Sequence, residues 1–231
     1  MFPVVTPNGN VEGLRTIVAM ASHDALTILR NSLSAHKLNY NLRASPCAGH
    51  HSLSKYDSIL RQAIGSVINI NLSNDQWIQA SLPVRLGGLG IRSVSMLAPS
   101  AFLASAAETK QIQDSILPSH STVPDTYVER LRTIWSSLSG CDYPLGPAVY
   151  KQKDLDQLVV EPLCAELLLK SSDRLTTVRL LAVAAPHSGD WLKALPMSSC
   201  GLRLDDEAIR VAVGLRLGAR LCLPHTCIWC C

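Results

Sequence analysis

Cysteine and histidine crowd the last ten residues of the chain, where their spacing could hold a metal ion. Cys222, Cys227 and Cys230 follow a Cys-x4-Cys-x2-Cys spacing, with His225 between the first two. Thiolate and imidazole are the ligands that a tetrahedral structural zinc site requires. Because four ligands within so short a stretch are tighter than usual, the spacing predicts half of a truncated zinc module and at most weak zinc binding. A complete site that includes His225 and a chance cluster of cysteines are the alternatives.

Two adjacent carboxylates form a second candidate metal site. Asp205 and Asp206 resemble the paired aspartates that hold two metal ions in polymerases, an arrangement that needs the tight turn of a strand hairpin. The residues that follow, EAIRVAVGLRLG, have a helical pattern instead. Acidic residues at a helix start accept the free amide hydrogens and complement the helix dipole. The pattern therefore favours helix capping over catalysis.

Histidine and aspartate also occur together twice, as His23-Asp24 and in the sequence HSGD at 187–190. Such pairs could supply a base and its orienting carboxylate to a serine nucleophile. Neither pair is accompanied by a G-x-S-x-G nucleophile elbow. Adjacent residues of a helix point to different faces, so surface or capping roles are favoured. A hydrolase remains a third hypothesis for function, with these pairs alone in its support.

Glycine-rich segments could bring backbone close to a ligand or to another helix. The stretch SLPVRLGGLGIRS contains Gly87, Gly88 and Gly90, but it lacks the spacing and the lysine of a P-loop. A structural turn is therefore favoured over a phosphate cradle. Gly214 and Gly218 lie four residues apart, which predicts close packing of the last helix against a neighbour.

Helices must position these groups, because apolar residues recur every three or four positions along most of the chain. Ser54 and Asp57 resemble a capping box at one helix start. No stretch alternates convincingly between apolar and polar residues, so the expected fold is all-α. The predicted helices lie at 11–34 (one or two), 54–68, 73–80, 95–108, around 128–138, 151–170, 172–185 and 205–221.

Composition excludes several classes of protein. The 231 residues carry a formal net charge of +3 and only 17% charged residues, and arginine outnumbers lysine by 14 to 7. An arginine excess suits bidentate contact with phosphate, whereas the small net charge does not by itself announce a nucleic-acid partner. No apolar run reaches the length of a membrane helix and the N-terminus lacks signal-peptide features. We therefore expect a non-membrane protein inside the cell, in the nucleus or the cytoplasm.

Four long strings together resemble a known family. They are SHDALTILRNSLSAHKLNYNLRASPC, YDSILRQAI, WIQASLPVRLGGLGIRSVSMLAPSAFLASAAE and SGDWLKALPMSSCGLRLDDEAIRVAVGLRLGARLCLPHTC. The chain resembles the segment that follows the reverse transcriptase domain in non-LTR retrotransposon proteins with a restriction-like endonuclease. The resemblance implies an unmatched N-terminus (1–21), a thumb-like helical domain (22–110), a linker with one helix (111–150), a helical linker domain (151–221) and a truncated zinc knuckle (222–231).

The resemblance also implies a nucleic-acid partner. Lys37, Arg43, Arg85 and Arg92 flank the thumb-like helices and the GGLG turn, where missing side chains would let a phosphate backbone approach. We expect weak, sequence-independent binding of RNA or DNA through these residues.

The departures from the family limit the expected activity. The polymerase motif Tyr-x-Asp-Asp and the nuclease are absent from this chain. We therefore expect no catalytic residues, no cofactor beyond weakly held zinc, and a non-catalytic fragment of a retrotransposon-encoded reverse transcriptase protein. The alternative is a helical protein-interaction adaptor derived from a mobile element. The low charge fraction favours that alternative, in which exposed apolar surface would also support self-association.

Overall fold

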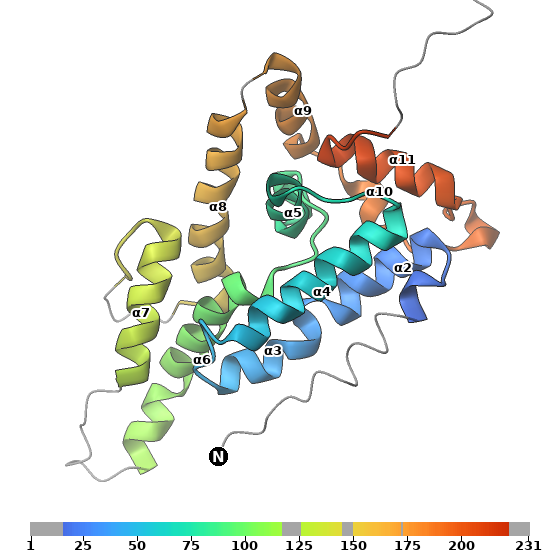
Figure 1. The fold of residues 1–231 in the computed structure, drawn as a ribbon. Coiled ribbons are helices and arrows are strands. Elements are labelled where there is room, and N and C mark those ends of the chain that lie inside the picture. The colour runs from blue at the N-terminus through green and yellow to red at the C-terminus, as the bar shows by residue number, and fades with distance from the viewer. Residues whose placement is uncertain (1–15, 117–125, 145–149, 172, 222–231) are drawn as a thin grey trace, which may run out of the picture.

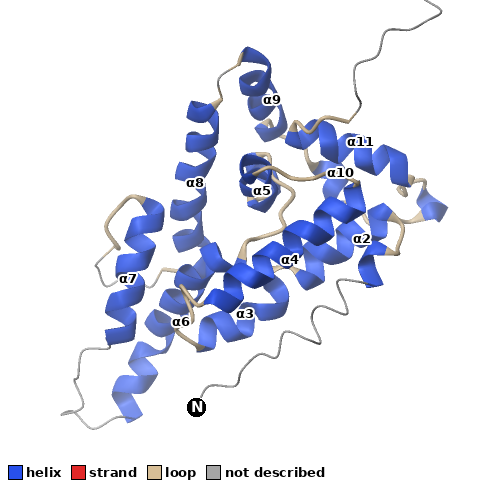
Figure 2. Cartoon of the chain, viewed as in Figure 1, coloured by secondary structure: helices blue, strands red, loops and turns tan. Residues whose placement is uncertain are grey.

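The computed structural model describes residues 16–116, 126–144, 150–171 and 173–221. Within these ranges the chain is helical and forms no strand, which confirms the all-α prediction (Figure 2). No helix in them is long and apolar enough to cross a membrane. In chain order the α-helices are α2 (Ser22–Ile28), α3 (Ala35–Ala44), α4 (His51–Ile68), α5 (Asn74–Ser81), α6 (Val94–Ile116), α7 (Thr126–Ser139), α8 (Gln152–Lys170), α9 (Arg174–Ala184), α10 (Asp190–Lys193) and α11 (Asp206–Leu217).

Helix α6 organises one half of the molecule, because α3, α4, α7 and α8 all pack against it (Figure 1). The fully buried Trp135 of α7 joins three of these helices. Its indole Nε1 lies 3.1 Å from the Ser100 hydroxyl of α6 and 3.3 Å from the Leu155 carbonyl oxygen of α8. A single side chain therefore fills the space between α6, α7 and α8 and has its polar atom satisfied there.

Helix α11 organises the other half and contacts α2, α4, α5 and α9. Since α4 touches both α6 and α11, it links the two halves (Figure 1). One hydrophobic core runs from Ile17 to Leu217 and contains residues of both the 22–110 and the 151–221 segments. Leu131 and Trp135 of α7, within the expected linker at 111–150, belong to the same core.

Asp57 has a different role from the one its spacing suggests. Helix α4 begins at His51, and Asp57 lies buried in its second turn rather than in a capping box with Ser54. Its carboxylate accepts hydrogen bonds from the backbone amides of Val94 (2.8 Å) and Ser95 (3.1 Å) at the start of α6. Asp57 thus caps a helix far along the chain and fastens α4 to α6.

Two of the differences from the predicted helices have a physical reason in the structure. Helix α3 was not predicted, since Asn39 and Asn41 have low helix propensity. Its face of Ala35, Leu38 and Leu42 is buried against α6, and this packing outweighs the propensity. The final helix was expected to reach residue 221, but it ends at Leu217.

Gly218 ends α11 because its backbone is left-handed, with φ of 64°. A Cβ at this position would lie 2.5 Å from Nε of Arg179 on α9. Gly214 has no room for a Cβ either, which would lie 2.2 Å from the Leu221 side chain, but Leu221 belongs to the segment that follows α11 and not to a neighbouring helix. Glycine therefore lets α11 and α9 approach each other closely.

Arg216 is the buried cation on which the loops around α11 converge. Its side chain lies in the interior, and the residue is only 4% exposed. Nε donates to the Gly88 carbonyl (3.1 Å), Nη2 to that of Val84 (2.9 Å) and Nη1 to that of Ser188 (3.2 Å). Burial lowers the pKa of this guanidinium. One side chain thus ties α11 to the 3-10 turn at Val84–Leu86, the glycine turn and the loop before α10.

We predict that Arg216→Lys lowers the free energy of unfolding by about 3 kcal/mol, because a single ammonium group cannot reach three carbonyls and leaves buried acceptors unpaired. Urea denaturation followed by circular dichroism measures the change. Arg220→Lys is the control, since Arg220 is exposed and should change stability by less than about 0.5 kcal/mol. Equal stability of the two variants would contradict the role given to Arg216.

Candidate nucleic-acid interface

The four residues expected to contact nucleic acid do not form one free surface. Arg92 makes an ion pair with Asp156 of α8, and the two side chains are 13% and 16% exposed. Its Nη1 also donates to the Ser81 carbonyl at 2.6 Å. Burial raises the pKa of the Asp156 carboxyl although Arg92 acts in the opposite direction. The guanidinium of Arg92 is therefore occupied in holding α8 against the end of α5.

Arg43 is also engaged within the protein. Its Nη2 lies 2.6 Å from Oε2 of Glu108 on α6, and its Nη1 lies 3.2 Å from Oε1 of Gln152 on α8. Gln152 in turn donates to the side chain of Asn39. Arg43 thus ties α3 to α6 and α8, and an incoming phosphate would have to compete with Glu108.

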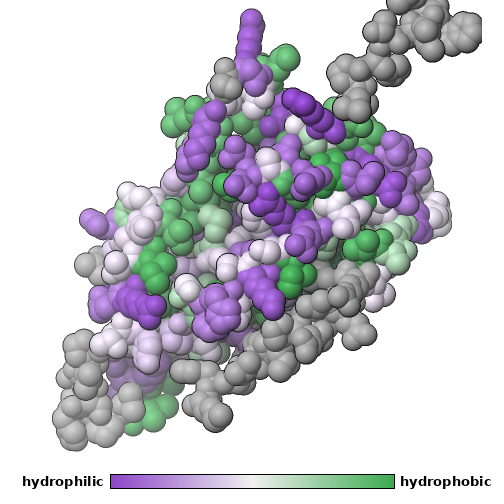
Figure 3. Space-filling model, viewed as in Figure 1, coloured by the Kyte–Doolittle hydropathy of each residue, from purple (hydrophilic) through white to green (hydrophobic). Residues whose placement is uncertain are grey.

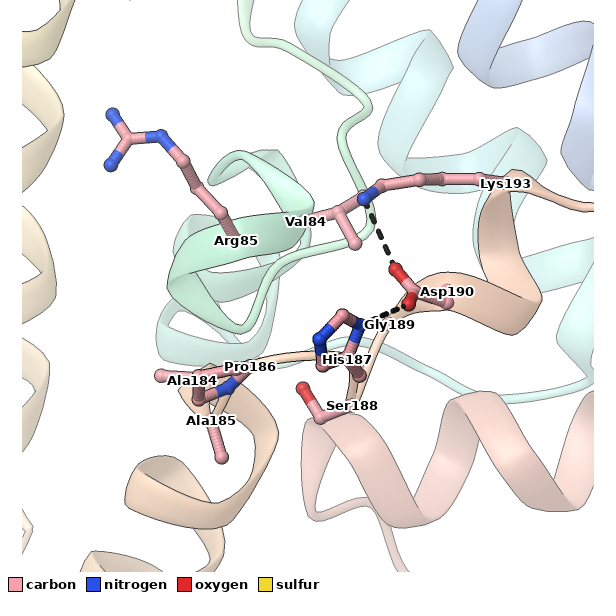
Figure 4. Close-up of a pocket in the computed structure, with 10 residues that line it drawn as sticks. All are labelled: Val84, Arg85, Ala184, Ala185, Pro186, His187, Ser188, Gly189, Asp190 and Lys193. Carbon is pink, nitrogen blue, oxygen red and sulfur yellow. Dashed lines mark hydrogen bonds and ion pairs between the residues drawn. The ribbon is translucent and has the colours of Figure 1, made fainter.

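Lys37 and Arg85 are exposed, and neither has a hydrogen-bond or ion-pair partner within the described ranges. They lie on separate elements, Lys37 on α3 and Arg85 on the 3-10 turn before the glycines. Figure 4 shows the Arg85 guanidinium directed away from His187 and Asp190. Of the four predicted residues, these two remain available to a ligand.

The glycine turn is structural. Gly87 and Gly88 are buried, and a Cβ on Gly88 would lie 2.0 Å from the Leu82 carbonyl oxygen. The carbonyl of Gly88 accepts from Arg216, and that of Gly87 accepts from Nε2 of the buried Gln79 at 3.1 Å. The turn therefore packs against protein at Gly87 and Gly88, which leaves these two glycines unexposed to a phosphate backbone.

The HSGD segment lines an open hollow of about 220 Å³ between the 3-10 turn and α10 (Figure 4). Nδ1 of His187 lies 2.7 Å from Oδ2 of Asp190, and Lys193 binds the other carboxylate oxygen at 3.2 Å. Both contacts lower the pKa of the Asp190 carboxyl, and the hydrogen bond from His187 has the larger effect. The Ser188 hydroxyl donates to the Val183 carbonyl at 2.6 Å, so it is not aligned with the imidazole. This geometry does not form a nucleophile–base pair.

The adjacent aspartates cap two different helices. Oδ1 of Asp205 accepts from the Ala208 amide at 2.7 Å and so caps α11, as the sequence indicated. Oδ1 of Asp206 accepts from the amide of Ser22 at 2.7 Å, at the start of α2. The two carboxylates are thus directed to separate helix ends. They do not converge on a shared site.

The His23-Asp24 pair also joins α2 to the segment that precedes α11. Nδ1 of His23 accepts from the Leu204 amide at 3.1 Å, and Asp24 forms an ion pair with Arg203. Burial lowers the pKa of the His23 imidazole, although the neighbouring Asp24 acts in the opposite direction. The pair is structural, and the imidazole is a neutral acceptor in this arrangement.

We predict that His23 makes the fold sensitive to acid. Its folded pKa lies below the unfolded value of about 6.5, so the unfolded chain takes up the proton first and stability declines as pH falls below that value. His23→Asn keeps an acceptor for Leu204 but cannot titrate. The stability of this variant should therefore fall less than that of the wild type between about pH 7.5 and about pH 5.

Urea midpoints measured across this pH range test the prediction. His36→Asn is the control, because His36 is exposed on α3 and should retain the wild-type decline. Identical pH profiles for His23→Asn and the wild type would contradict it.

A surface that the sequence interpretation missed lies on α3 and the first turns of α4. Residues 25–56 contain no aspartate or glutamate. The exposed side chains here include five that are basic, aromatic or imidazole groups, which together define the α3–α4 surface: His36, Lys37, Tyr40, His51 and Lys55. The next acid in the sequence, Asp57, is buried in its capping role. The absence of acidic residues over this stretch was the available signal.

No group of three or more metal-binding side chains occurs within the described ranges. The predicted zinc ligands Cys222, Cys227 and Cys230, and the candidate His225, lie outside them. The zinc site stays a prediction.

Comparison of the chain with protein-family models, with curated proteins and with solved structures finds no match. The resemblance to retrotransposon proteins therefore rests on the sequence strings given above.

Proposed function

We propose that this chain is a non-catalytic, nucleic-acid-binding segment of a retrotransposon-encoded reverse transcriptase protein, and that it contacts RNA or DNA through the α3–α4 surface. The observation that carries the proposal is the exposure of Lys37 and Lys55 in or beside a stretch of chain, residues 25–56, that contains no aspartate or glutamate. The resemblance to the post-polymerase segment supplies the family. Arg43 and Arg92, which the sequence favoured, are occupied by Glu108 and Asp156.

The solvent side of α4 suits contact with a phosphate backbone. Ser54, Lys55, Ser58 and Gln62 are exposed there at helical spacing, and the surface over α4 in Figure 3 is mainly hydrophilic. The ammonium group of Lys55 and the side-chain amide of Gln62 can donate to phosphate in contacts that carry no sequence information, whereas the hydroxyls of Ser54 and Ser58 already donate to backbone carbonyls of α4. Since only a few cations take part, we expect weak, sequence-independent binding.

The carboxylates support the non-catalytic part of the proposal. Asp205 and Asp206 each accept an amide hydrogen bond at a different helix start. Catalysis with two metal ions needs carboxylates that converge on ions about 3.5–4 Å apart. These two side chains serve the fold instead.

We predict that Lys37→Ala combined with Lys55→Ala weakens duplex and single-strand binding. The slope of log affinity against log salt should fall in magnitude by roughly one per lysine, because each phosphate contact that is lost means about one counterion fewer released on binding. Fluorescence anisotropy over a salt series measures both quantities.

The matched control is Lys110→Ala combined with Lys170→Ala. These two lysines are also exposed but pair with Asp114 and Glu166, so both the affinity and the salt slope should stay at wild-type values. If the α3–α4 double variant behaves like this control, the surface does not bind nucleic acid.

A second candidate function, self-association as an adaptor, is favoured by α9. None of its residues is buried, and Leu175, Val178 and Leu181 are 83%, 55% and 56% exposed along one side. Figure 3 shows hydrophobic surface at the end of α8 and on α9. A stripe with this spacing can pair with its own copy across a twofold axis.

We expect self-association through α9 to be insensitive to salt and to be abolished by Leu175→Gln combined with Leu181→Gln, since apolar burial drives it. Sedimentation velocity at several protein concentrations measures this. Ile112→Gln, at another exposed aliphatic residue near the end of α6, is the control. A monomeric wild-type chain at all concentrations would exclude the adaptor function in this form.

A further inference from the structure

Tyr40 is the most exposed aromatic side chain in the described part of the protein. It lies on the solvent side of α3 and is 80% exposed, although tyrosine usually buries much of its ring. No hydrogen bond or ring contact holds the phenol within the described ranges. Both faces of the ring are therefore open to a ligand.

The neighbours of Tyr40 on the helix supply what a nucleic-acid strand would need. Lys37 and Arg43 lie three residues before and after it, and His36 and Ala44 lie four residues away, so all four are its helical neighbours. Lys37 is a free cation, whereas Arg43 is fixed at the edge of the surface by Glu108. The exposed Ala44 is small and leaves room beside the ring. The result is an open aromatic ring flanked by cations.

We propose that Tyr40 is a stacking platform for an unpaired base, and that the α3–α4 surface therefore selects single-stranded over double-stranded nucleic acid. This inference rests on the proposed nucleic-acid-binding function and adds the class of ligand to it. Bases within a duplex have both faces covered by neighbouring pairs, so they offer none to Tyr40. An unpaired base can lie on the ring while its phosphate reaches Lys37, which lies three residues away on the same helix.

The two contributions can be separated by their chemistry. Phosphate contacts depend on salt and act on any backbone, whether or not bases are attached. Base–aromatic stacking tolerates every base and requires that a base be present. Stacking on Tyr40 should therefore appear as a difference between a strand with bases and the same strand without them.

The experiment measures binding of the full chain to three probes of equal length by fluorescence anisotropy: a thymidine oligonucleotide, its abasic counterpart and a duplex. We expect the wild type to prefer the thymidine strand over the abasic strand by about tenfold. Tyr40→Ala should remove this preference and leave abasic binding and its salt slope unchanged, while Tyr40→Phe should retain the preference. Tyr127→Ala, at the other exposed tyrosine of the described residues, is the control.

The outcomes separate the inference from the function on which it rests. Equal wild-type affinity for the thymidine and abasic strands, with a salt slope that depends on Lys37 and Lys55, would overturn the stacking role alone. An equal loss of affinity for both strands in Tyr40→Ala would overturn it as well. Absence of binding to every probe would overturn the proposed function together with the inference. Because Tyr40 is exposed, circular dichroism should show that both variants keep the wild-type fold.

Discussion

The buried guanidinium of Arg216 is the interaction on which the arrangement around α11 depends. It satisfies three carbonyls from segments that are far apart in sequence, those of Val84, Gly88 and Ser188. No carboxylate pairs with it within the described ranges, so its charge is stabilised by backbone dipoles alone. A buried cation without good partners would be strongly destabilising. The glycine turn and the loop before α10 must therefore hold their carbonyls in place together, which couples their conformations.

The same principle explains why the arginine excess misled the sequence interpretation. Arg92 donates to the Ser81 carbonyl, Arg61 to that of Leu72, and Arg30 to that of Leu192. Arginine suits carbonyl groups at helix ends for the reason that it suits phosphate, since several donors lie in one rigid plane. Composition therefore cannot distinguish the two uses. The structure shows that much of the excess stabilises the interior, which is why the lysines of α3 and α4 now carry the proposed contact with nucleic acid.

Local patterns predicted the fold well and long-range contacts poorly. The period of apolar residues located α4, α6, α8 and α11 to within a few residues, except that α6 continues beyond its expected end, and Asp205 caps α11 as its position indicated. Asp57 and Asp206 were assigned to their own segments, but each caps a helix formed by distant residues. Helix α3 was missed because its asparagines oppose helix formation and only the packing of Leu38 and Leu42 outweighs them. Contacts of this kind are fixed by tertiary structure, which sequence spacing does not encode.

Polar and aromatic side chains that make no structural contact are the best candidates for binding a ligand. The capping aspartates, the buried imidazole of His23 and the glycine turn are all engaged in structural contacts. Lys37, Tyr40 and Lys55 have no such contacts in the described part of the chain, and no acidic side chain in the sequence from 25 to 56 opposes them. The open ring of Tyr40 and the two ammonium groups are the kinds of group that contact bases and phosphates in the proposed function. The fold thus leaves on α3 and α4 the groups that a binding function would need.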